Sequence, residues 1–259
     1  MRVARTIAII NQKGGVGKTT TAVNLAAALA DAGRAVLLVD LDPQANATSG
    51  VGVNWKDLPV GMYEVLLGEL PIDAILHPTG HDGLHIAPAT PALAGAQIDL
   101  VTVPEREHKL AQALQAVEQD VDYIFLDCPP SLGLITVNAL AAADEVLVPV
   151  QAEYFALEGL GQLLETVAAA QERLSPGLSI LGAVLTMYDR KTGLANDVWL
   201  ELYKHFPNRI FRSVIPRSVR LAEAPSHGET IFGLDPGSRA ARAYEKLARE
   251  VLWAHGSGN

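Results

Sequence analysis

One stretch near the start of the chain has the residue types and the spacing of a phosphate-binding site. It spans residues 12–20 and reads Gln-Lys-Gly-Gly-Val-Gly-Lys-Thr-Thr. Glycines allow successive backbone N–H groups to converge on phosphate oxygens, and a helix N-terminus adds positive potential there. In such a loop Lys18 would reach the β- and γ-phosphates, and the Thr19 hydroxyl would bind Mg²⁺. The stretch therefore predicts a nucleotide site lined by Lys13, Gly14, Gly15, Val16, Gly17, Lys18, Thr19 and Thr20.

The loop departs from the ordinary P-loop motif at one position. That motif has a glycine five residues before Gly17, where this chain has Gln12. A second lysine, Lys13, begins the loop, and it could donate to a phosphate in its own site or in a partner's site. The alternative is a glycine-rich turn with incidental lysines. The loop follows an apolar run at residues 6–10, so we favour the nucleotide site.

Three aspartates follow predicted strands and could complete the site. Asp40 and Asp42 come at the end of the apolar run 35–40, and Asp127 ends the run 121–127. The carboxyl ends of parallel strands meet at one edge of a sheet, where ligands bind. Asp127 would hold a Mg²⁺-bound water across from Thr19, as in a Walker B strand. For Asp40 we expect a supporting metal role; the alternative is that Asp40 and Asp42 only cap a turn.

The elements that position these residues alternate between strand and helix. Apolar runs predict buried strands, and longer periodic stretches, beginning with an amphipathic helix over residues 22–32, predict helices between them. This pattern favours an α/β fold with a doubly wound, mostly parallel sheet flanked by helices. We expect a single domain over residues 1–255 and a frayed tail at residues 256–259. Further strands are predicted at 84–89, 145–150 and 178–186, and further helices at 63–67, 109–117, 134–143, 160–170 and 238–254.

Composition limits the remaining classes of function. The chain has 259 residues, of which 49% are hydrophobic, which suffices for one large core. Its single cysteine, Cys128, argues against a disulfide framework and against a cluster held by several thiolates, and it fits a reducing cytoplasm. We see no apolar span of about 18 residues and no signal peptide. The net charge of −9 means that any DNA contact must come from a local basic patch.

Residues 13–20 resemble the deviant Walker A box of the ParA/MinD ATPases, and the resemblance extends over nearly the whole chain. It is closest to the chromosomal ParA proteins also called Soj. The resemblance implies ATP and Mg²⁺ as cofactors and slow ATP hydrolysis. It implies catalytic roles for Lys13, Lys18 and Asp42, of which Asp42 matches the family's water-activating aspartate. Mg²⁺ would be held by Thr19, Asp40 and Asp127, and Pro129-Pro130-Ser131 resembles the family's segment that senses the γ-phosphate.

A basic stretch follows later in the chain. Residues 203–220 contain five cations, Lys204, Arg209, Arg212, Arg217 and Arg220, and no acidic residue. Such a run could contact DNA phosphates, or it could be an ordinary solvated face. The resemblance implies nonspecific DNA binding through Lys191, or its neighbour Arg190, and through Arg217 and Arg220. It also places Met187, Pro216 and Ser218 beside the adenine, although the family more often has asparagine where this chain has Ser218.

The resemblance further implies an ATP-dependent homodimer in which Lys13 of each subunit reaches the other's phosphates. The segment 151–159 resembles the family's dimer interface. The dimer would bind double-stranded DNA without reading sequence, on the nucleoid in the cytoplasm, and a ParB-type protein would stimulate hydrolysis. A MinD-like membrane-positioning ATPase is the alternative, but it needs a lipid-binding tail, and helix 238–254 has mixed charge. An iron–sulfur relative would need more cysteines, and a non-hydrolysing DNA scaffold would not need Asp42 and Asp127.

Overall fold

The computed structural model describes residues 4–153, 159–189 and 194–256. Within them an eight-stranded sheet has the strand order β3-β4-β2-β5-β1-β6-β7-β8. Every neighbouring pair is parallel except β3 with β4. This confirms the predicted fold class. The strands are β1 Arg5–Ile9, β2 Val36–Asp40, β3 His77–Pro78, β4 Leu84–Ala87, β5 Tyr123–Asp127, β6 Glu145–Gln151, β7 Ser179–Tyr188 and β8 Ile210–Pro216.

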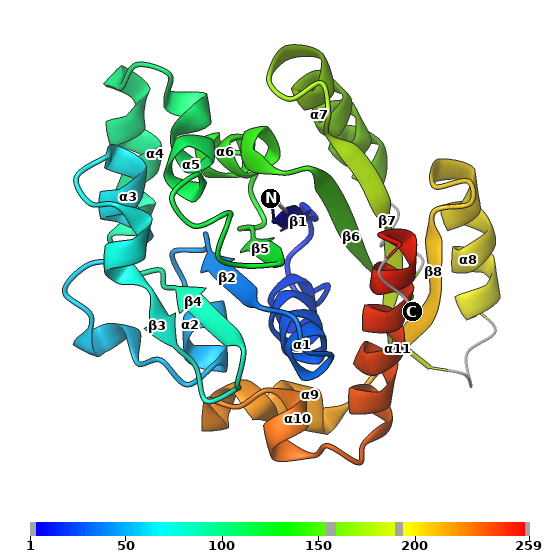
Figure 1. Ribbon diagram of the computed structural model, residues 1–259. Helices are drawn as coiled ribbons and strands as arrows, with labels where there is room; N and C mark the ends of the chain where they lie inside the picture. The colour runs from blue at the N-terminus through cyan, green and yellow to red at the C-terminus, as the bar shows by residue number, and fades with distance from the viewer. Residues whose placement is uncertain (1–3, 154–158, 190–193, 257–259) are drawn as a thin grey trace.

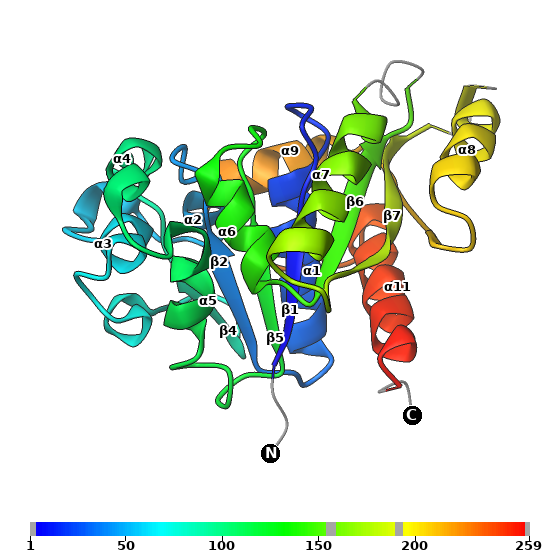
Figure 2. The same ribbon diagram turned by 90° about the horizontal axis from the view of Figure 1, so that it is seen from above.

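Helices cover both faces of the sheet, so the central strands are buried on both sides (Figures 1 and 2). Helices α3 to α8 share one apolar core with the sheet, and α1, α2 and α9 to α11 share the other. No helix in the described part of the chain is long and apolar enough to cross a membrane. The helices are α1 Lys18–Asp31, α2 Asn46–Gly50, α3 Met62–Leu67, α4 Leu93–Asp99, α5 Lys109–Leu114, α6 Leu134–Ala142, α7 Leu160–Arg173, α8 Leu194–His205, α9 Val219–Glu223, α10 Ile231–Leu234 and α11 Arg239–Ala254.

Helix α1 differs from the prediction in its start and in its surroundings. It begins at Lys18, directly after Gly17, whose φ of 87° allows the loop to turn into the helix. It is buried over most of its circumference rather than amphipathic, because α11, α2 and α10 pack against it in addition to the sheet. The Thr21 hydroxyl lies 3.4 Å from the Tyr244 hydroxyl of α11 and ties the two helices together.

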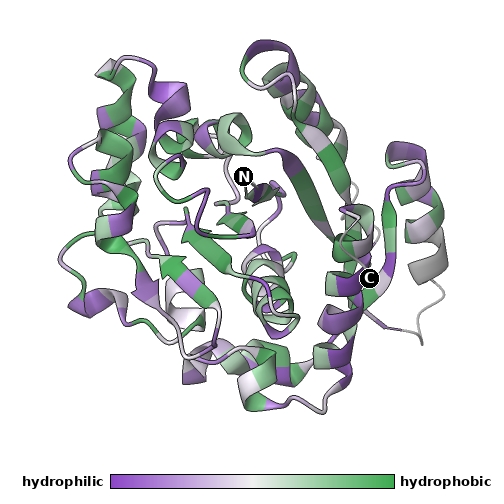
Figure 3. Ribbon diagram, in the orientation of Figure 1, coloured by the Kyte–Doolittle hydropathy of each residue, from purple (hydrophilic) through white to green (hydrophobic). Residues whose placement is uncertain are grey.

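Helix α11 begins at Arg239 after a Ser238 cap and fills the predicted range. Apolar and polar residues alternate along it, as both colours on its ribbon in Figure 3 show. Its apolar face packs into the core through Tyr244, Leu247 and Val251, none of which is exposed to solvent. The helix is therefore docked along its length.

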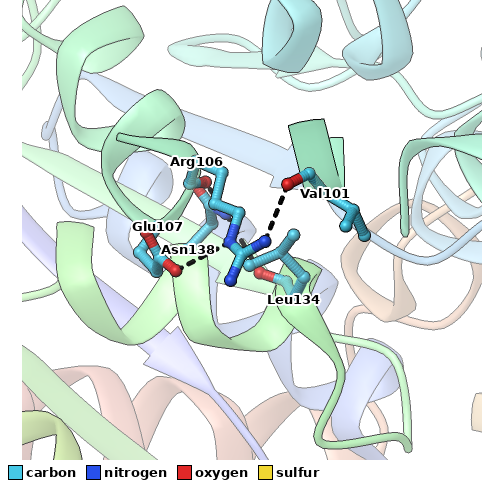
Figure 4. A network of polar contacts seen from close by, with 5 residues as sticks. All are labelled: Val101, Arg106, Glu107, Leu134 and Asn138. Atoms are coloured by element: carbon cyan, nitrogen blue, oxygen red, sulfur yellow. Dashed lines mark hydrogen bonds and ion pairs between the residues drawn. The ribbon is translucent and has the colours of Figure 1, made fainter. Parts of the chain in front are cut away.

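The irregular segment between α4 and α5 is held by hydrogen bonds to α6 (Figure 4). The buried Asn138 amide donates to the carbonyl oxygens of Arg106 at 2.7 Å and Leu134 at 3.0 Å. Arg106 in turn donates to the carbonyl of Val101 at 2.7 Å and pairs with Glu107 at 2.9 Å. The bonds to the carbonyls of Arg106 and Val101 satisfy backbone acceptors of this irregular segment, whereas Leu134 belongs to α6 itself.

Candidate functional site

The glycine-rich loop lies between the end of β1 and the start of α1. Gly15 and Gly17 have φ of 74° and 87°, the left-handed region that favours glycine. The Lys18 ammonium donates to the carbonyl oxygen of Lys13 at 3.1 Å, across the loop. The loop therefore folds back on itself at the N-terminus of a 14-residue helix, as a phosphate cradle requires.

Two side chains that the sequence did not single out fix the loop to the sheet. Asn11 donates to the carbonyl of Pro149 at 2.8 Å and accepts the N–H of Lys13 at 3.0 Å. Thr186 of β7 donates to the carbonyl of Val16 at 2.7 Å. Asn11 could have been found as a turn former directly after a strand. Thr186 gave no signal, because it lies 170 residues from its partner.

The strand register brings two buried carboxylates together at the same edge. Asp127 pairs with Ile9 on one side and with Asp40 on the other. Neither aspartate is exposed to solvent. Among the described residues, neither carboxylate oxygen of Asp127 accepts a hydrogen bond of ordinary distance and angle, although the Thr19 hydroxyl is near enough to lower its pKa. A buried carboxylate without donors costs free energy unless a cation or a proton neutralises it.

Asp40 is satisfied by the turn that follows it. One of its carboxylate oxygens accepts the Thr48 N–H at 2.8 Å and the Thr48 hydroxyl at 2.7 Å, and the other accepts the Asp42 N–H at 3.1 Å. Because both oxygens already accept protein donors, Asp40 holds the turn, and any metal role of Asp40 is a supporting one.

The pKa values reflect this crowding of buried charge. Burial, with the neighbouring Asp40 carboxylate, raises the pKa of Asp127 well above its ordinary value, although Thr19 and Lys18 oppose the shift. Burial raises the pKa of Asp40 to about 6. Burial lowers the pKa of Lys18, against the attraction of Asp127. The site thus contains one desolvated cation and two desolvated carboxylates. An added cation would lower the free-energy cost of burying the two negative charges.

The donor set fits Mg²⁺ only together with phosphate. In the described parts of the chain, no three His, Cys, Asp or Glu residues are grouped as ligands of a metal ion. Mg²⁺ commonly takes one or two carboxylates and completes its shell with phosphate oxygens and waters. Asp127, whose oxygens have no well-formed hydrogen bond within the described residues, and the neighbouring Thr19 match that requirement.

Asp42 occupies the turn after β2 and is half-buried. One of its carboxylate oxygens accepts the N–H of Gln44 at 3.0 Å. Asp42 is close enough to Lys18 and Asp127 to influence the pKa of each. The structure therefore brings Lys18, Asp42 and Asp127 to one place from three separate strand ends, as the sequence predicted.

Known proteins of similar sequence show to which family this chain belongs. A family model described as an AAA domain matches residues 4–180. The sporulation initiation inhibitor protein Soj of Bacillus subtilis is 53% identical, over 96% of this chain and 98% of that protein. The chromosome partitioning protein ParA of Myxococcus xanthus is 49% identical, over 96% of this chain and 88% of that protein. The chain belongs to the ParA/Soj family.

A solved structure extends the likeness to three dimensions. A Mycobacterium smegmatis protein described as cobyrinic acid a,c-diamide synthase, with bound ADP and magnesium, is 39% identical. It superposes with a TM-score of 0.88 over 99% of this chain and 97% of its own. The family resemblance read from residues 13–20 and the P-loop ATPase fold are thereby confirmed.

The residues that the ParA/Soj resemblance associates with adenine lie near one another. Tyr188 of β7 pairs with Pro216 of β8, which brings Met187 and Pro216 to one end of the sheet. The sequence placed Met187 after the strand, which is wrong: β7 continues to Tyr188, and Met187 lies within it with a φ of 52°. Ser218 caps α9, where its hydroxyl accepts the Leu221 N–H at 3.4 Å.

The residues that the ParA/Soj resemblance associates with DNA are partly paired with acids. Lys191 and its neighbour Arg190 lie outside the described residues. Arg217 pairs with Glu153 and Arg220 with Glu223, each at 3.1 Å. The basic stretch 203–220 contains no acidic residue, but in the folded chain acidic side chains from outside it pair with two of its arginines. All four side chains are exposed, so solvent screens these pairs and DNA phosphates can compete with them.

Cys128, next to Asp127, is a buried core thiol. Its sulfur contacts the carbonyl of Leu126 at 3.6 Å. Burial raises the pKa of the Cys128 thiol well above its ordinary value. It therefore stays protonated and unreactive.

Proposed function

We propose that this chain is a ParA/Soj-type partition ATPase, which binds ATP and Mg²⁺ and hydrolyses ATP to ADP and phosphate. The observation that carries the proposal is the buried Asp127 carboxylate at the strand edge beside the glycine-rich loop, which accepts no hydrogen bond of ordinary geometry from the described residues. A Mg²⁺ ion there would neutralise charge on the phosphates. Thr19 and Asp127 would hold the ion, with Asp40 supporting the turn behind it. The chromosome partitioning protein ParA of Myxococcus provides the biological setting.

The chain's own residues would contribute positioning and charge. The desolvated Lys18 ammonium would bind the terminal phosphates, and a charge in a dry site acts more strongly than one in water. Backbone N–H groups of Gly14 to Thr20 would cradle the phosphate oxygens. Asp42 would orient the attacking water. Met187, Pro216 and Ser218 would line the adenine end.

Gly14 supports an ATP-dependent homodimer. Unlike Gly15 and Gly17, Gly14 has no left-handed φ, and a Cβ added there would meet no atom within 4 Å. It is also exposed. Nothing in the described part of the subunit therefore demands glycine at this position, whereas the close approach of a second subunit would. In that dimer Lys13, at the adjoining position, would reach the partner's phosphates.

DNA binding and a ParB-type partner complete the proposal. Lys191, Arg217 and Arg220 would contact the backbone of double-stranded DNA without reading sequence, so the ATP-bound dimer would reside on the nucleoid in the cytoplasm. The ParB-type protein would stimulate hydrolysis and release the DNA. A MinD-like membrane role is disfavoured, because the apolar face of the C-terminal helix α11 is already buried in the core.

Amide synthesis, which the name of the Mycobacterium structure denotes, finds little support in this chain. Transfer of ammonia from glutamine ordinarily uses an activated cysteine. The only cysteine here, Cys128, is buried and its pKa is raised. We therefore favour the partition function of the curated relatives.

The test is retention of DNA by the purified protein with ATP, with ADP and without nucleotide, on two duplexes of unrelated sequence. The proposal predicts retention with ATP only, equal on both duplexes. Retention that ignores nucleotide, or that selects one duplex, would contradict it.

A further inference from the structure

An open groove whose charged lining residues are mostly basic lies between the edge strand β8 and helix α11, and we refer to it as the α11 groove. Its volume is about 1050 Å³. Six of its lining residues are cationic and two are acidic, in a chain whose net charge is −9. The cations are Arg212 and Arg217 on the β8 side and Arg239, Arg242, Lys246 and Arg249 on α11.

The four cations on α11 form a regular row. Their spacing of three, four and three residues places them on one face of the helix. From Arg239 to Arg249 the helix rises by about 15 Å. One strand of B-form DNA has a phosphate for about every 3.4 Å of axis, so the row matches about four consecutive phosphates.

Of the two acids in the groove, Asp189 and Glu250, the second is committed to the backbone rather than to the cations. Glu250 is engaged by the protein backbone, since its carboxylate oxygens accept the N–H groups of Arg212 and Ser213, each at 2.8 Å. Within the described residues, no ion pair engages any of the four α11 cations. All four are exposed. Arg242 donates one hydrogen bond, to the carbonyl oxygen of Gly237 at 2.6 Å, and a guanidinium has further N–H groups, so all four cations remain available to a polyanion.

The same helix argues against a lipid surface as the polyanion. A membrane-bound amphipathic helix inserts its apolar face between lipids. Here Tyr244, Leu247 and Val251 bury that face in the core, so insertion would require α11 to leave the sheet. Trp253, which is 79% exposed, is the one large apolar side chain that α11 presents to solvent in the described structure. The cationic row remains the binding feature.

Arg217 connects the groove to the DNA contacts already proposed, because it lines the groove and also lies three residues before Arg220. We propose that the α11 groove is a second contact surface for duplex DNA, in which Arg242, Lys246 and their neighbours on α11 hold one strand's phosphate backbone. This inference rests on the proposed function. It extends the DNA surface from the α9 region along α11.

The test compares two double variants of equal charge change. Arg242→Gln with Lys246→Gln removes two cations from the groove and keeps their side-chain length. Lys56→Gln with Arg173→Gln is the matched control, because both residues are exposed and neither lines the groove. DNA affinity is measured on a duplex of unrelated sequence with a non-hydrolysable ATP analogue, over a range of salt concentrations. Thermal unfolding of each variant verifies the fold.

The groove variant is expected to bind DNA at least about tenfold more weakly at moderate salt, and the slope of log affinity against log salt should become shallower by about 2. The control variant should stay within about twofold of the wild type. A groove variant that matches the control in both affinity and slope would overturn the proposal. So would a variant that loses binding to vesicles of anionic lipid but keeps its DNA affinity.

Arg220→Glu, measured in parallel, separates the two proposals. If Arg220→Glu loses DNA and the groove variant does not, the DNA-binding function stands and the groove assignment is wrong. If the wild type itself retains no DNA with the ATP analogue, both the DNA-binding part of the proposed function and the assignment of the α11 groove are wrong.

Discussion

The glycine-rich loop edge and the α11 groove both concentrate charge, but in opposite ways. At the loop edge, Lys18, Asp40 and Asp127 are buried, and the last accepts no hydrogen bond of ordinary geometry from the described residues. In the groove the cations are exposed, numerous and evenly spaced. Buried charges interact strongly and depend on exact placement, whereas exposed charges act weakly, additively and in proportion to their number. One region is thus suited to chemistry on a single ligand and the other to holding a long polyanion.

The largest expected effect follows from neutralising the buried cation. Lys18→Gln removes the charge that would bind the terminal phosphates in a desolvated site. We expect kcat/KM for ATP to fall by about 10²–10³. Steady-state phosphate release measures it. Arg242→Gln, a neutralisation in the groove, serves as the comparison, and a similar loss in both variants would erase the contrast between the regions.

Asp42→Ala tests the half-buried member of the loop edge. If Asp42 orients water, hydrolysis should slow by about 10²-fold or more while affinity for ATP is kept, because Lys18 and the loop remain. Single-turnover hydrolysis and nucleotide titration separate these two quantities. Normal turnover in this variant would remove Asp42 from the mechanism.

Asp127→Asn should stabilise the nucleotide-free protein while it weakens Mg²⁺-dependent ATP binding. Because burial raises the pKa of Asp127 in the folded state, the folded chain binds this proton more tightly than the unfolded chain, and stability falls as pH rises through that pKa. Because the asparagine amide does not ionise, the free energy of unfolding of Asp127→Asn should exceed that of the wild type by about 1–3 kcal/mol at neutral pH.

The pH dependence sharpens this prediction. The advantage of Asp127→Asn over the wild type should be small near pH 4 and grow as pH rises, since only the wild type loses the proton. Asp40, whose pKa is raised to about 6, should add a fall in wild-type stability between about pH 4 and pH 6. Denaturant unfolding at several pH values measures both. A constant difference across pH would show that Asp127 carries no buried charge.

Thr186→Val is expected to have the smallest effect. It keeps the side-chain shape but removes the hydroxyl that donates to the carbonyl of Val16, so the free energy of unfolding should fall by about 1 kcal/mol. Thermal unfolding with and without nucleotide measures this loss of stability. Thr166→Val, at a half-buried threonine whose hydroxyl donates to the Gln162 carbonyl of its own helix, is the control and should cost less.

The sequence predicted those parts of the molecule that depend on neighbours along the chain. The loop, the strands that end in Asp40 and Asp127, and helix α11 were recognisable because glycine spacing and periodicity are local. The burial of α1 on nearly all sides was not predictable, because it depends on α11, more than 200 residues away in the chain.

The sequence also could not predict which charged side chains stay unpaired, because ion pairs join residues that are far apart in the chain. Arg217 forms an ion pair with Glu153 of a distant segment, so the folded chain partly neutralises a stretch that has no acidic residue of its own. Conversely, α11 has mixed charge in sequence, yet its Glu250 turns to the backbone of β8 and leaves a basic face. Which charges remain available is decided by tertiary contacts.

The most direct test of the contrast is to measure, on the wild type, how salt affects the two affinities. We expect affinity for a non-hydrolysable ATP analogue with Mg²⁺ to change only a few-fold between about 50 and 200 mM salt, because Lys18 and Asp127 are buried. Affinity for DNA should fall by about 10²-fold or more over the same range. Two affinities that fall in parallel would contradict the account, because both sites would then act as exposed surfaces.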